Sequence, residues 1–331
     1  MLHALGWSYD IEPVLLNREL SRDQIGAAEN LIAARARNRI PAAYLTQKMW
    51  FAGHEFFVDE RVLVPRSPCA ELILDGFQPW LGSRSLSRVL EIGTGSGCIA
   101  VAVALAFPQA VVHATDCSAA ALDVAAVNVK RHAVESRVIL HQCDLFPCEN
   151  PQRYDLIISN PPYVPRARWE ELPPEYQAEP ESGLVAGDDG LDCVERILER
   201  AAGFLQDDGL LVVEVGEIWK DVMQRFPSLP FTWVDLAWGG EGVFVLSAKI
   251  SGEAGAVDSQ QLVLRSLVKS PDVWKHIWKV IHGDLGRGES WAWLCGDNRW
   301  LSAWDSAGRS GPAARSGPTQ AGKVEAYDAA A

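Results

Sequence analysis

The sequence lacks any long apolar run, although the chain is 331 residues long. No stretch approaches the roughly 20 apolar residues that a membrane-spanning helix requires. The first 20 residues also lack the basic flank and apolar stretch of a signal peptide. We therefore expect neither a membrane protein nor an exported one. With 48% hydrophobic and 22% charged residues, the composition is typical of a folded protein with two domains, or with one domain and appendages.

Cysteine pairs at metal-binding spacing are also missing. The seven cysteines include no Cys-x-x-Cys pair, and no histidine joins them at metal-ligand spacing. The odd number disfavours a disulfide framework. We therefore expect reduced thiols, a cytoplasmic protein and no metal site.

Positive charge is scarce. The chain has 30 basic and 43 acidic residues, and residues 170–217 hold fourteen acidic residues against two basic ones. Such a surface repels phosphates, so nucleic acid is not expected as the main partner, whereas a basic protein would be attracted. The simpler alternative is that these acidic side chains are solvated helix faces and caps.

The first part of the chain predicts helices and one hairpin. Residues 11–40 have helical periodicity, which predicts Ser21 as an N-cap and Pro41 as the end of the pattern. Aromatic and β-branched residues around Gly53 predict a β-hairpin within 48–64. Residues 69–77 predict one short helix.

From residue 88 onward, short apolar runs alternate with helical segments or loops. This alternation predicts an α/β fold with βαβ units, in which helices cover both faces of a mostly parallel sheet. The last two runs are joined by a glycine-rich turn at 238–242, so these two strands should pair antiparallel. The seven predicted strands are 88–92, 110–115, 137–141, 154–159, 209–215, 231–236 and 242–247.

After about residue 250 the composition changes. The pattern at 271–282, where tryptophan and isoleucine form a stripe, predicts one amphipathic helix. Beyond residue 305, glycine, serine, alanine and proline dominate without periodicity, which predicts disorder.

A glycine loop follows the first predicted strand of the sheet. Residues 91–97 read Glu-Ile-Gly-Thr-Gly-Ser-Gly, and glycines at 93, 95 and 97 permit a sharp turn and close approach of the backbone to a ligand. The spacing is tighter than the G-x-G-x-x-G of dinucleotide sites, which favours a ligand without phosphates. Alone, such a loop is weak evidence.

Two carboxylates follow the next two strands. Asp116 could accept both ribose hydroxyls of a nucleoside. Asp144 could accept from the exocyclic amine of an adenine, with Leu145 and Phe146 as an apolar wall. Each carboxylate could instead cap a helix or a turn. Because carboxyl ends of parallel strands meet at one edge of a sheet, the three signals together predict an S-adenosylmethionine pocket.

The element Asn160-Pro161-Pro162-Tyr163 follows the fourth strand at the same edge. Asn160 and Pro161 each precede a proline, so both should be extended, with the Pro161 carbonyl free to accept a hydrogen bond. That carbonyl and the Asn160 side-chain oxygen match a planar NH₂ group, on which Tyr163 could pack. The alternative is a rigid turn in which Asn160 bonds its own backbone.

These motifs resemble the class I methyltransferases that modify planar amino groups, namely the protein glutamine-N5 and the adenine-N6 methyltransferases. Pro65-Arg66-Ser67-Pro68 differs from the Pro-Arg-Pro-Glu-Thr of the branch that acts on release factors. The resemblance is closer to the branch that acts on the third large-subunit ribosomal protein (uL3), and it covers about residues 1–248. The blocks that carry it are 39–46, 50–56, 58–68, 176–180 and 186–192.

The resemblance implies a domain organisation and a set of site residues. It implies a helical substrate-docking region at 1–47, expected to begin partway through a longer family region, and a hairpin linker at 48–66. A methyltransferase domain would occupy 67–249, with an atypical tail at 250–331. The catalytic residues would be Asn160, Pro161, Pro162 and Tyr163, and the cofactor residues would be Glu91, Gly93, Thr94, Gly95, Ser96, Gly97, Asp116, Asp144, Leu145 and Asn160.

The implied reaction is S-adenosylmethionine-dependent methylation of the side-chain amide nitrogen of a glutamine in uL3. Three alternatives remain open at this point. An adenine-N6 methyltransferase would need a basic groove and a way to extrude a base, which the acidic balance disfavours. The others are a release-factor glutamine methyltransferase and a non-catalytic adapter that binds uL3.

Overall fold

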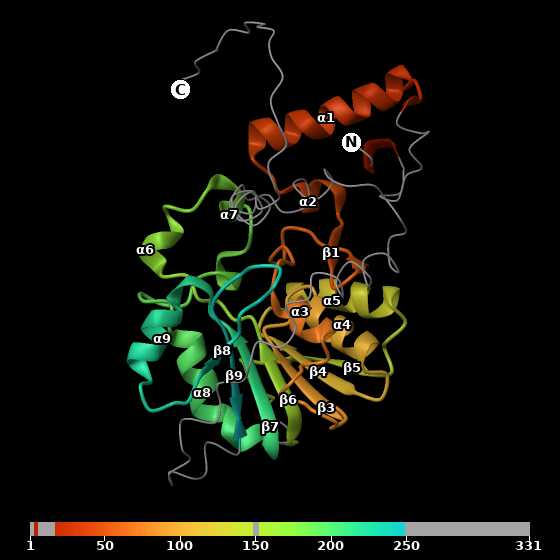
Figure 1. Cartoon of the computed structure of the whole chain (residues 1–331). Helices are drawn as coiled ribbons and strands as arrows, with labels where there is room; N and C mark the ends of the chain where they lie inside the picture. Colours follow the sequence, from red (N-terminus) through yellow and green to blue (C-terminus); the bar gives the residue numbers. More distant parts are fainter. Residues whose placement is uncertain (1–2, 6–16, 148–151, 249–331) are drawn as a thin grey trace, which may run out of the picture. The chain divides into compact units, whose positions relative to one another are not determined.

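The computed structural model describes residues 3–5, 17–147 and 152–248 (Figure 1). The chain divides into two units, Met1–Val257 and Asp258–Ala331, and every described residue belongs to the first. The helix expected at 271–282 therefore lies outside the described residues. Within the described ranges, no helix combines the length and the apolar character needed to cross a membrane.

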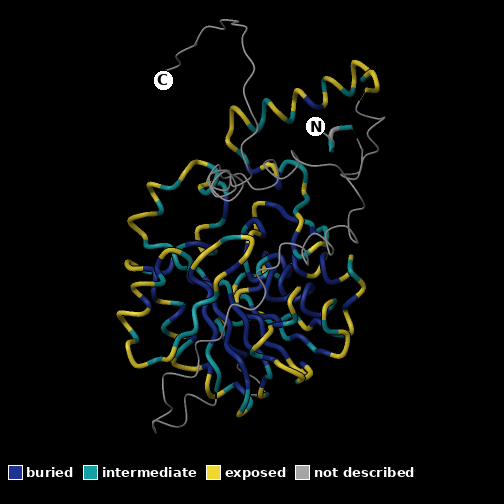
Figure 2. The backbone as a smooth tube through the Cα atoms, viewed as in Figure 1, coloured by how far each residue is buried: buried dark blue, intermediate teal, exposed yellow. Residues whose placement is uncertain are grey.

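The N-terminal region begins with the short 3₁₀-helix η1 (His3–Leu5) and contains two α-helices. Helix α1 (Arg22–Asn38) starts at the expected N-cap: the Ser21 hydroxyl accepts from the Gln24 N–H, and the Gln24 side chain accepts from the Ser21 N–H. The expected helix is wrong for residues 18–20, which are not helical. Much of α1 is exposed (Figure 2). Helix α2 (Ala42–Thr46) follows Pro41.

The predicted hairpin is confirmed, in a shorter form. Strands β1 (Met49–Phe51) and β2 (His54–Phe56) pair antiparallel. Ala52 and Gly53 have φ values of 47° and 80°, the left-handed conformations that a tight two-residue hairpin turn requires.

The predicted sheet is confirmed, with seven strands in the order β5-β4-β3-β6-β7-β9-β8. Neighbours from β5 to β7 are parallel. β9 runs antiparallel to β8, as expected, and it also pairs antiparallel with β7, which was not predicted. β7 begins four residues before its predicted start, and β8 is only two residues long. The strands are β3 (Arg88–Ile92), β4 (Val111–Asp116), β5 (Val138–Gln142), β6 (Tyr154–Ser159), β7 (Leu205–Glu214), β8 (Thr232–Trp233) and β9 (Val243–Ser247).

Helices cover both faces of this sheet (Figure 1). Consecutive residues of a strand point to opposite faces: Val89 and Leu156 belong to the apolar cluster shared with α3 and α4, while Leu90 and Ile157 belong to the cluster shared with α8. The central strands, which contribute residues to both clusters, are buried (Figure 2). The helices are α3 (Cys69–Leu74), α4 (Cys98–Ala106), α5 (Ala119–Arg131), α8 (Asp192–Phe204) and α9 (Trp219–Arg225).

A third apolar cluster joins the N-terminal region to the sheet domain. Tyr44 of α2 packs with Val58, Val62 and Val64 from the segment after the hairpin and with Val124 of α5. Segment 58–64 is therefore anchored by burial rather than by strand pairing. The remaining short helices lie between β6 and α9: α6 (Arg166–Trp169), α7 (Pro174–Gln177), η3 (Glu181–Gly183) and η4 (Gly216–Ile218).

Candidate functional site

The carboxyl ends of four neighbouring strands are bonded into one rim. The N–H groups of Gly93 and Thr94, after β3, both donate to the Thr115 carbonyl of β4 at 2.9 Å. The Thr115 hydroxyl donates to the Leu145 carbonyl after β5 at 2.6 Å. The Ser159 hydroxyl of β6 donates to the Ile92 carbonyl at 2.8 Å. The motifs predicted to meet at this edge are therefore held together by direct hydrogen bonds.

The glycine loop has the backbone that its sequence predicts. Gly93, Gly95 and Gly97 have φ values of 71°, 52° and 78°. A Cβ at Gly97 would lie 3.1 Å from the Ala125 Cβ, so this glycine permits close packing of the loop on α5. A Cβ at Gly95 would meet nothing within 4 Å, which leaves open space beside the loop at that position.

Glu91 lies beneath the loop and is only 1% exposed. Its Oε2 accepts from the Thr94 hydroxyl at 2.5 Å and from the Ala100 N–H at 2.9 Å, so it ties the loop to the start of α4. Its Oε1 is buried without a hydrogen-bonding partner. Burial raises the pKa of Glu91 to about 8. Thr94 and Ser96 are each 3% exposed, which places their side chains within the fold of the loop.

Asp116 braces the same loop from the end of β4. Its Oδ2 accepts from the Gly95 N–H at 2.9 Å, and its Oδ1 accepts from the Ser118 N–H at 2.9 Å. The N-cap of α5 is Ser118 rather than Asp116, because the Ser118 hydroxyl accepts from the Ala121 N–H. A carboxylate oxygen has a second lone pair, so Asp116 retains acceptor capacity for a diol.

The residues after β5 depart in part from expectation. Asp144 forms an ion pair of 2.6 Å with Arg196, and its side chain is 64% exposed. Leu145 takes the left-handed conformation, with φ 65°, which turns the chain sharply at the rim. Phe146 as a wall of the pocket is wrong: it is fully buried and stacks on Phe204 at 4.7 Å, because core packing favours that large ring.

The Asn-Pro-Pro-Tyr turn lies beside the glycine loop. A Cβ at Gly93 would come within 4.0 Å of the Asn160 carbonyl oxygen. Within the described ranges, no hydrogen bond involves the Asn160 side chain or the Pro161 carbonyl. The alternative of an asparagine bonded to its own backbone is therefore not what the structure has.

Tyr163 is held at three points. Its hydroxyl donates to Oε1 of Glu214 at 3.3 Å. A Cβ at Gly216 would lie 2.7 Å from the Tyr163 ring, and one at Gly190 would overlap the Tyr163 carbonyl. Both glycines have positive φ, so glycine allows close approach of the backbone on two sides of this tyrosine. Burial raises the pKa of Tyr163 above its usual range, which keeps the hydroxyl a donor.

Sequence reasoning missed four polar residues around this turn. Arg66 forms an ion pair of 2.7 Å with Glu179 and lies over the Tyr176 ring at 4.7 Å. Glu179 also accepts from the Val64 N–H at 2.9 Å. Ser67 donates to Oε2 of Glu214 at 2.5 Å. Blocks 58–68 and 176–180 carried the family resemblance, and that was the signal that could have identified these residues.

The acidic stretch 170–217 is substantially neutralised by arginines. Glu175 pairs with Arg35 of α1 and with Arg39, the C-cap residue of that helix, each at 2.8 Å, and so connects α7 to the N-terminal region. Seven of the fourteen acidic residues therefore have an arginine partner, which reduces the negative charge that this stretch offers to a basic protein. The paired residues are Glu175, Glu179, Glu181, Glu195, Asp207, Asp208 and Glu217.

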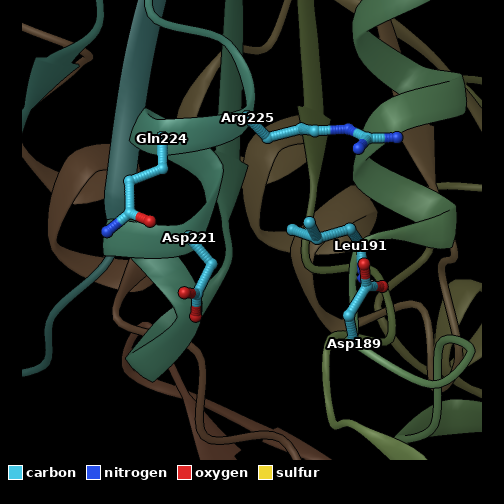
Figure 3. Close-up of a pocket in the computed structure, with 5 residues that line it drawn as sticks. All are labelled: Asp189, Leu191, Asp221, Gln224 and Arg225. Atoms are coloured by element: carbon cyan, nitrogen blue, oxygen red, sulfur yellow. The ribbon is translucent and has the colours of Figure 1, made fainter.

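A separate pocket of about 330 Å³ lies between the start of α8 and helix α9 (Figure 3). Its lining includes none of the predicted site residues. Arg225 points toward α8, where its guanidinium pairs with Glu195 at 2.7 Å. The full lining is Asp189, Leu191, Asp221, Gln224 and Arg225. Among the described residues, no group of three or more His, Cys, Asp or Glu side chains could hold a metal ion.

Comparisons with known proteins extend these observations. The family model "Methyltransferase small domain" matches residues 70–171. A ribosomal protein uL3 glutamine methyltransferase of Burkholderia pseudomallei is 44% identical over 256 residues, which is 75% of this chain and 83% of that protein. A protein of the same name from Xanthomonas campestris is 45% identical over 250 residues, which is 75% of this chain and 80% of that one.

Solved structures are more distant. A methyltransferase from Pyrococcus furiosus is 18% identical and aligns with 69% of this chain and 99% of its own, with a TM-score of 0.42. The two curated relatives therefore carry the comparison, since their similarity spans most of both chains.

Proposed function

Because the chain belongs to the ribosomal protein uL3 glutamine methyltransferases, we propose that it methylates the side-chain amide nitrogen of a glutamine in uL3, with S-adenosylmethionine as donor. The observation that carries the proposal is the 44–45% identity over three quarters of the chain, together with an intact Asn160–Tyr163 turn on the rim. The names of these relatives favour uL3 over release factors and nucleic acid as the substrate.

The rim has features that fit S-adenosylmethionine. The space beside Gly95, the Asp116 carboxylate and the unpartnered Oε1 of Glu91 would suit a ligand with a ribose and an amino-acid moiety. Gly93, Gly95 and Gly97 would shape the turn around it, Asp116 would bind the ribose hydroxyls, and Asp144 and Leu145 would border the adenine. When bound, this cofactor supplies a methyl group already activated on a sulfonium.

Asn160, Pro161 and Tyr163 would position the target amide. An amide nitrogen is a poor nucleophile because its lone pair is delocalised into the carbonyl. The Asn160 side-chain oxygen and the Pro161 carbonyl would each accept a hydrogen bond from one of its two N–H groups, which aims the nitrogen and raises its electron density. Pro162 would keep the turn rigid, and Tyr163 would pack against the planar group.

The surroundings of the site support a protein substrate. Residues 1–47 would dock uL3, and the ion pairs from Arg35 and Arg39 to Glu175 would couple α1 to the segment after the turn. Residues 48–66 would link that region to the methyltransferase domain at 67–249. A cytoplasmic location fits the free thiols of Cys69, Cys98, Cys117 and Cys193.

The direct test is to incubate the full chain with uL3 and methyl-labelled S-adenosylmethionine and to sequence the products by mass spectrometry. We expect label on one glutamine side chain of uL3, and we expect the Asn160→Ala variant to form it about 10²–10³-fold more slowly. Parallel incubations contain a release factor and adenine-containing DNA. Preferential labelling of either one, or no labelling of uL3, would overturn the proposal.

A further inference from the structure

The carboxylate of Glu214, at the end of β7, joins two loops on the rim. Its Oε2 accepts from the Ser67 hydroxyl at 2.5 Å, and its Oε1 accepts from the Tyr163 hydroxyl at 3.3 Å. Ser67 lies 147 residues before Glu214 in the chain, and Tyr163 lies 51 residues before it. The Glu214 residue is only 6% exposed. A carboxylate that is expensive to bury thus has each oxygen on a specific hydroxyl.

The same contact determines the orientation of Tyr163. Gly216, two residues after Glu214, places its backbone against the Tyr163 ring, while Glu214 holds the hydroxyl of that ring. The residues at the end of β7 therefore fix both the position and the rotation of the Tyr163 ring. Ser67 belongs to the Pro-Arg-Ser-Pro loop, so Glu214 connects this loop to the turn that would hold the target amide.

We propose that Glu214 is a positioning residue for methyl transfer, which acts by orienting Tyr163 and by coupling the Ser67 loop to the Asn-Pro-Pro-Tyr turn. The inference rests on the proposed function, because it concerns the amide site. Glu214 does not touch the reacting atoms. It acts through Tyr163, and a displacement of that ring would misplace the amide relative to its two acceptors.

The protonation state of Glu214 should matter for this role. When ionised, Glu214 accepts from both hydroxyls; when protonated, it donates its own proton and one hydroxyl loses an acceptor. Burial raises the pKa of Glu214 to about 7, while the hydrogen bonds from Ser67 and Tyr163 and the charge of Arg66 oppose the rise. Cys69 of α3 also faces it, and burial and the Glu214 charge raise the pKa of that thiol. The rate should therefore fall as pH drops below about 7.

The first test compares Glu214→Gln with Asp155→Asn in the uL3 methylation assay. Asp155, near the start of β6, accepts from the Ser87 and Arg88 N–H groups, both at 2.8 Å. It therefore lies at the amino ends of the strands, away from the rim. We expect Glu214→Gln to lower kcat about tenfold, equivalent to one hydrogen bond of about 1.4 kcal/mol, with unchanged affinity for S-adenosylmethionine. The fall in rate below about pH 7 (the acidic limb of the pH profile) should disappear. Asp155→Asn should retain the kcat and the limb.

Tyr163→Phe provides a second and independent test, since it keeps the ring and removes only the hydroxyl. We expect a similar fall in kcat and no fall in rate below about pH 7, because the hydroxyl through which Glu214 acts is gone. The double variant should be no slower than Tyr163→Phe, because both changes break one contact. If Glu214→Gln does not fold, Tyr163→Phe decides alone.

The outcomes separate this inference from the proposed function. If the wild-type chain does not methylate uL3, the proposed function is wrong. If it does, and Tyr163→Phe or a folded Glu214→Gln retains the wild-type kcat and pH profile, only the positioning role is wrong. Additive losses in the double variant would likewise overturn it, since they would place the two residues in separate roles.

Discussion

The backbone N–H of Gly95 donates to Oδ2 of Asp116 across 2.9 Å. The carboxylate expected to bind the ribose therefore also supports the loop on which the cofactor would lie. Asp116 would therefore affect the site in two ways, by binding the cofactor and by supporting the loop. A control variant at the N-terminus of α5 is needed beside any substitution of Asp116.

We predict that Asp116→Ala weakens S-adenosylmethionine binding by about 1–3 kcal/mol, the usual cost of leaving buried hydrogen-bonding groups unpaired. Isothermal calorimetry measures this directly. The control is Ser118→Ala, which removes the α5 N-cap without touching the loop. It should lower stability by about 1 kcal/mol and leave the affinity unchanged. Equal affinity of Asp116→Ala and wild type would exclude Asp116 from the site.

Asn160→Ala should slow methylation of uL3 by about 10²–10³-fold, because it removes one acceptor from a preorganised site. The turn contributes no described hydrogen bond through this side chain, so the variant should fold and bind S-adenosylmethionine nearly as well as wild type. Asn160→Asp keeps an acceptor oxygen but adds a charge, and partial activity is expected. Wild-type turnover of a folded Asn160→Ala variant would show that the turn is only structural.

Glu91 should make the fold less stable at high pH. The pKa of this buried carboxyl is about 8 in the folded chain, against an ordinary 4.5. Its contribution to stability is complete below pH 4.5 and is lost as pH rises through 8, by up to about 1.4 kcal/mol per pH unit.

Urea unfolding at pH 5, 7 and 9 tests this expectation with Glu91→Gln. The variant should lose less stability than wild type between pH 5 and pH 9, because its neutral amide has no proton to release. Glu135→Gln, an exposed change, should follow the wild-type curve. Parallel curves for wild type and Glu91→Gln would mean that Glu91 does not titrate in this range.

The acidic segment should steer a basic substrate in proportion to the charges that arginines do not neutralise. Glu170 and Glu171 are exposed, and we predict that reversing both to lysine slows association with uL3. Stopped-flow rates should also fall between about 0.01 M and 0.15 M salt, as the Debye length shrinks from about 30 Å to about 8 Å. The matched control is Glu135→Lys, because Glu135 precedes β5 at the amino ends of the strands, away from the rim. An association rate that does not change with salt concentration would show that these acidic residues do not attract the substrate.

The sequence alone predicted the strands, their mostly parallel arrangement and the rim on which the motifs meet. Alternation of apolar runs with helical segments is a local property, and the carboxyl ends of parallel strands must share one edge. The Ser21 cap and the turn at Gly53 were equally readable, because each depends on residues within one turn of chain. The family blocks then indicated the reaction.

The contacts that organise the site were decided only by the tertiary structure. Ser67 meets Glu214 across 147 residues, and Arg66 meets Glu179 across 113. No periodicity specifies such pairs, because they depend on how the loops cross above the sheet. Burial decided the rest: Phe146 follows the apolar core rather than the pocket, and Glu91 and Glu214 gain raised pKa values only because folding removes both carboxyls from water.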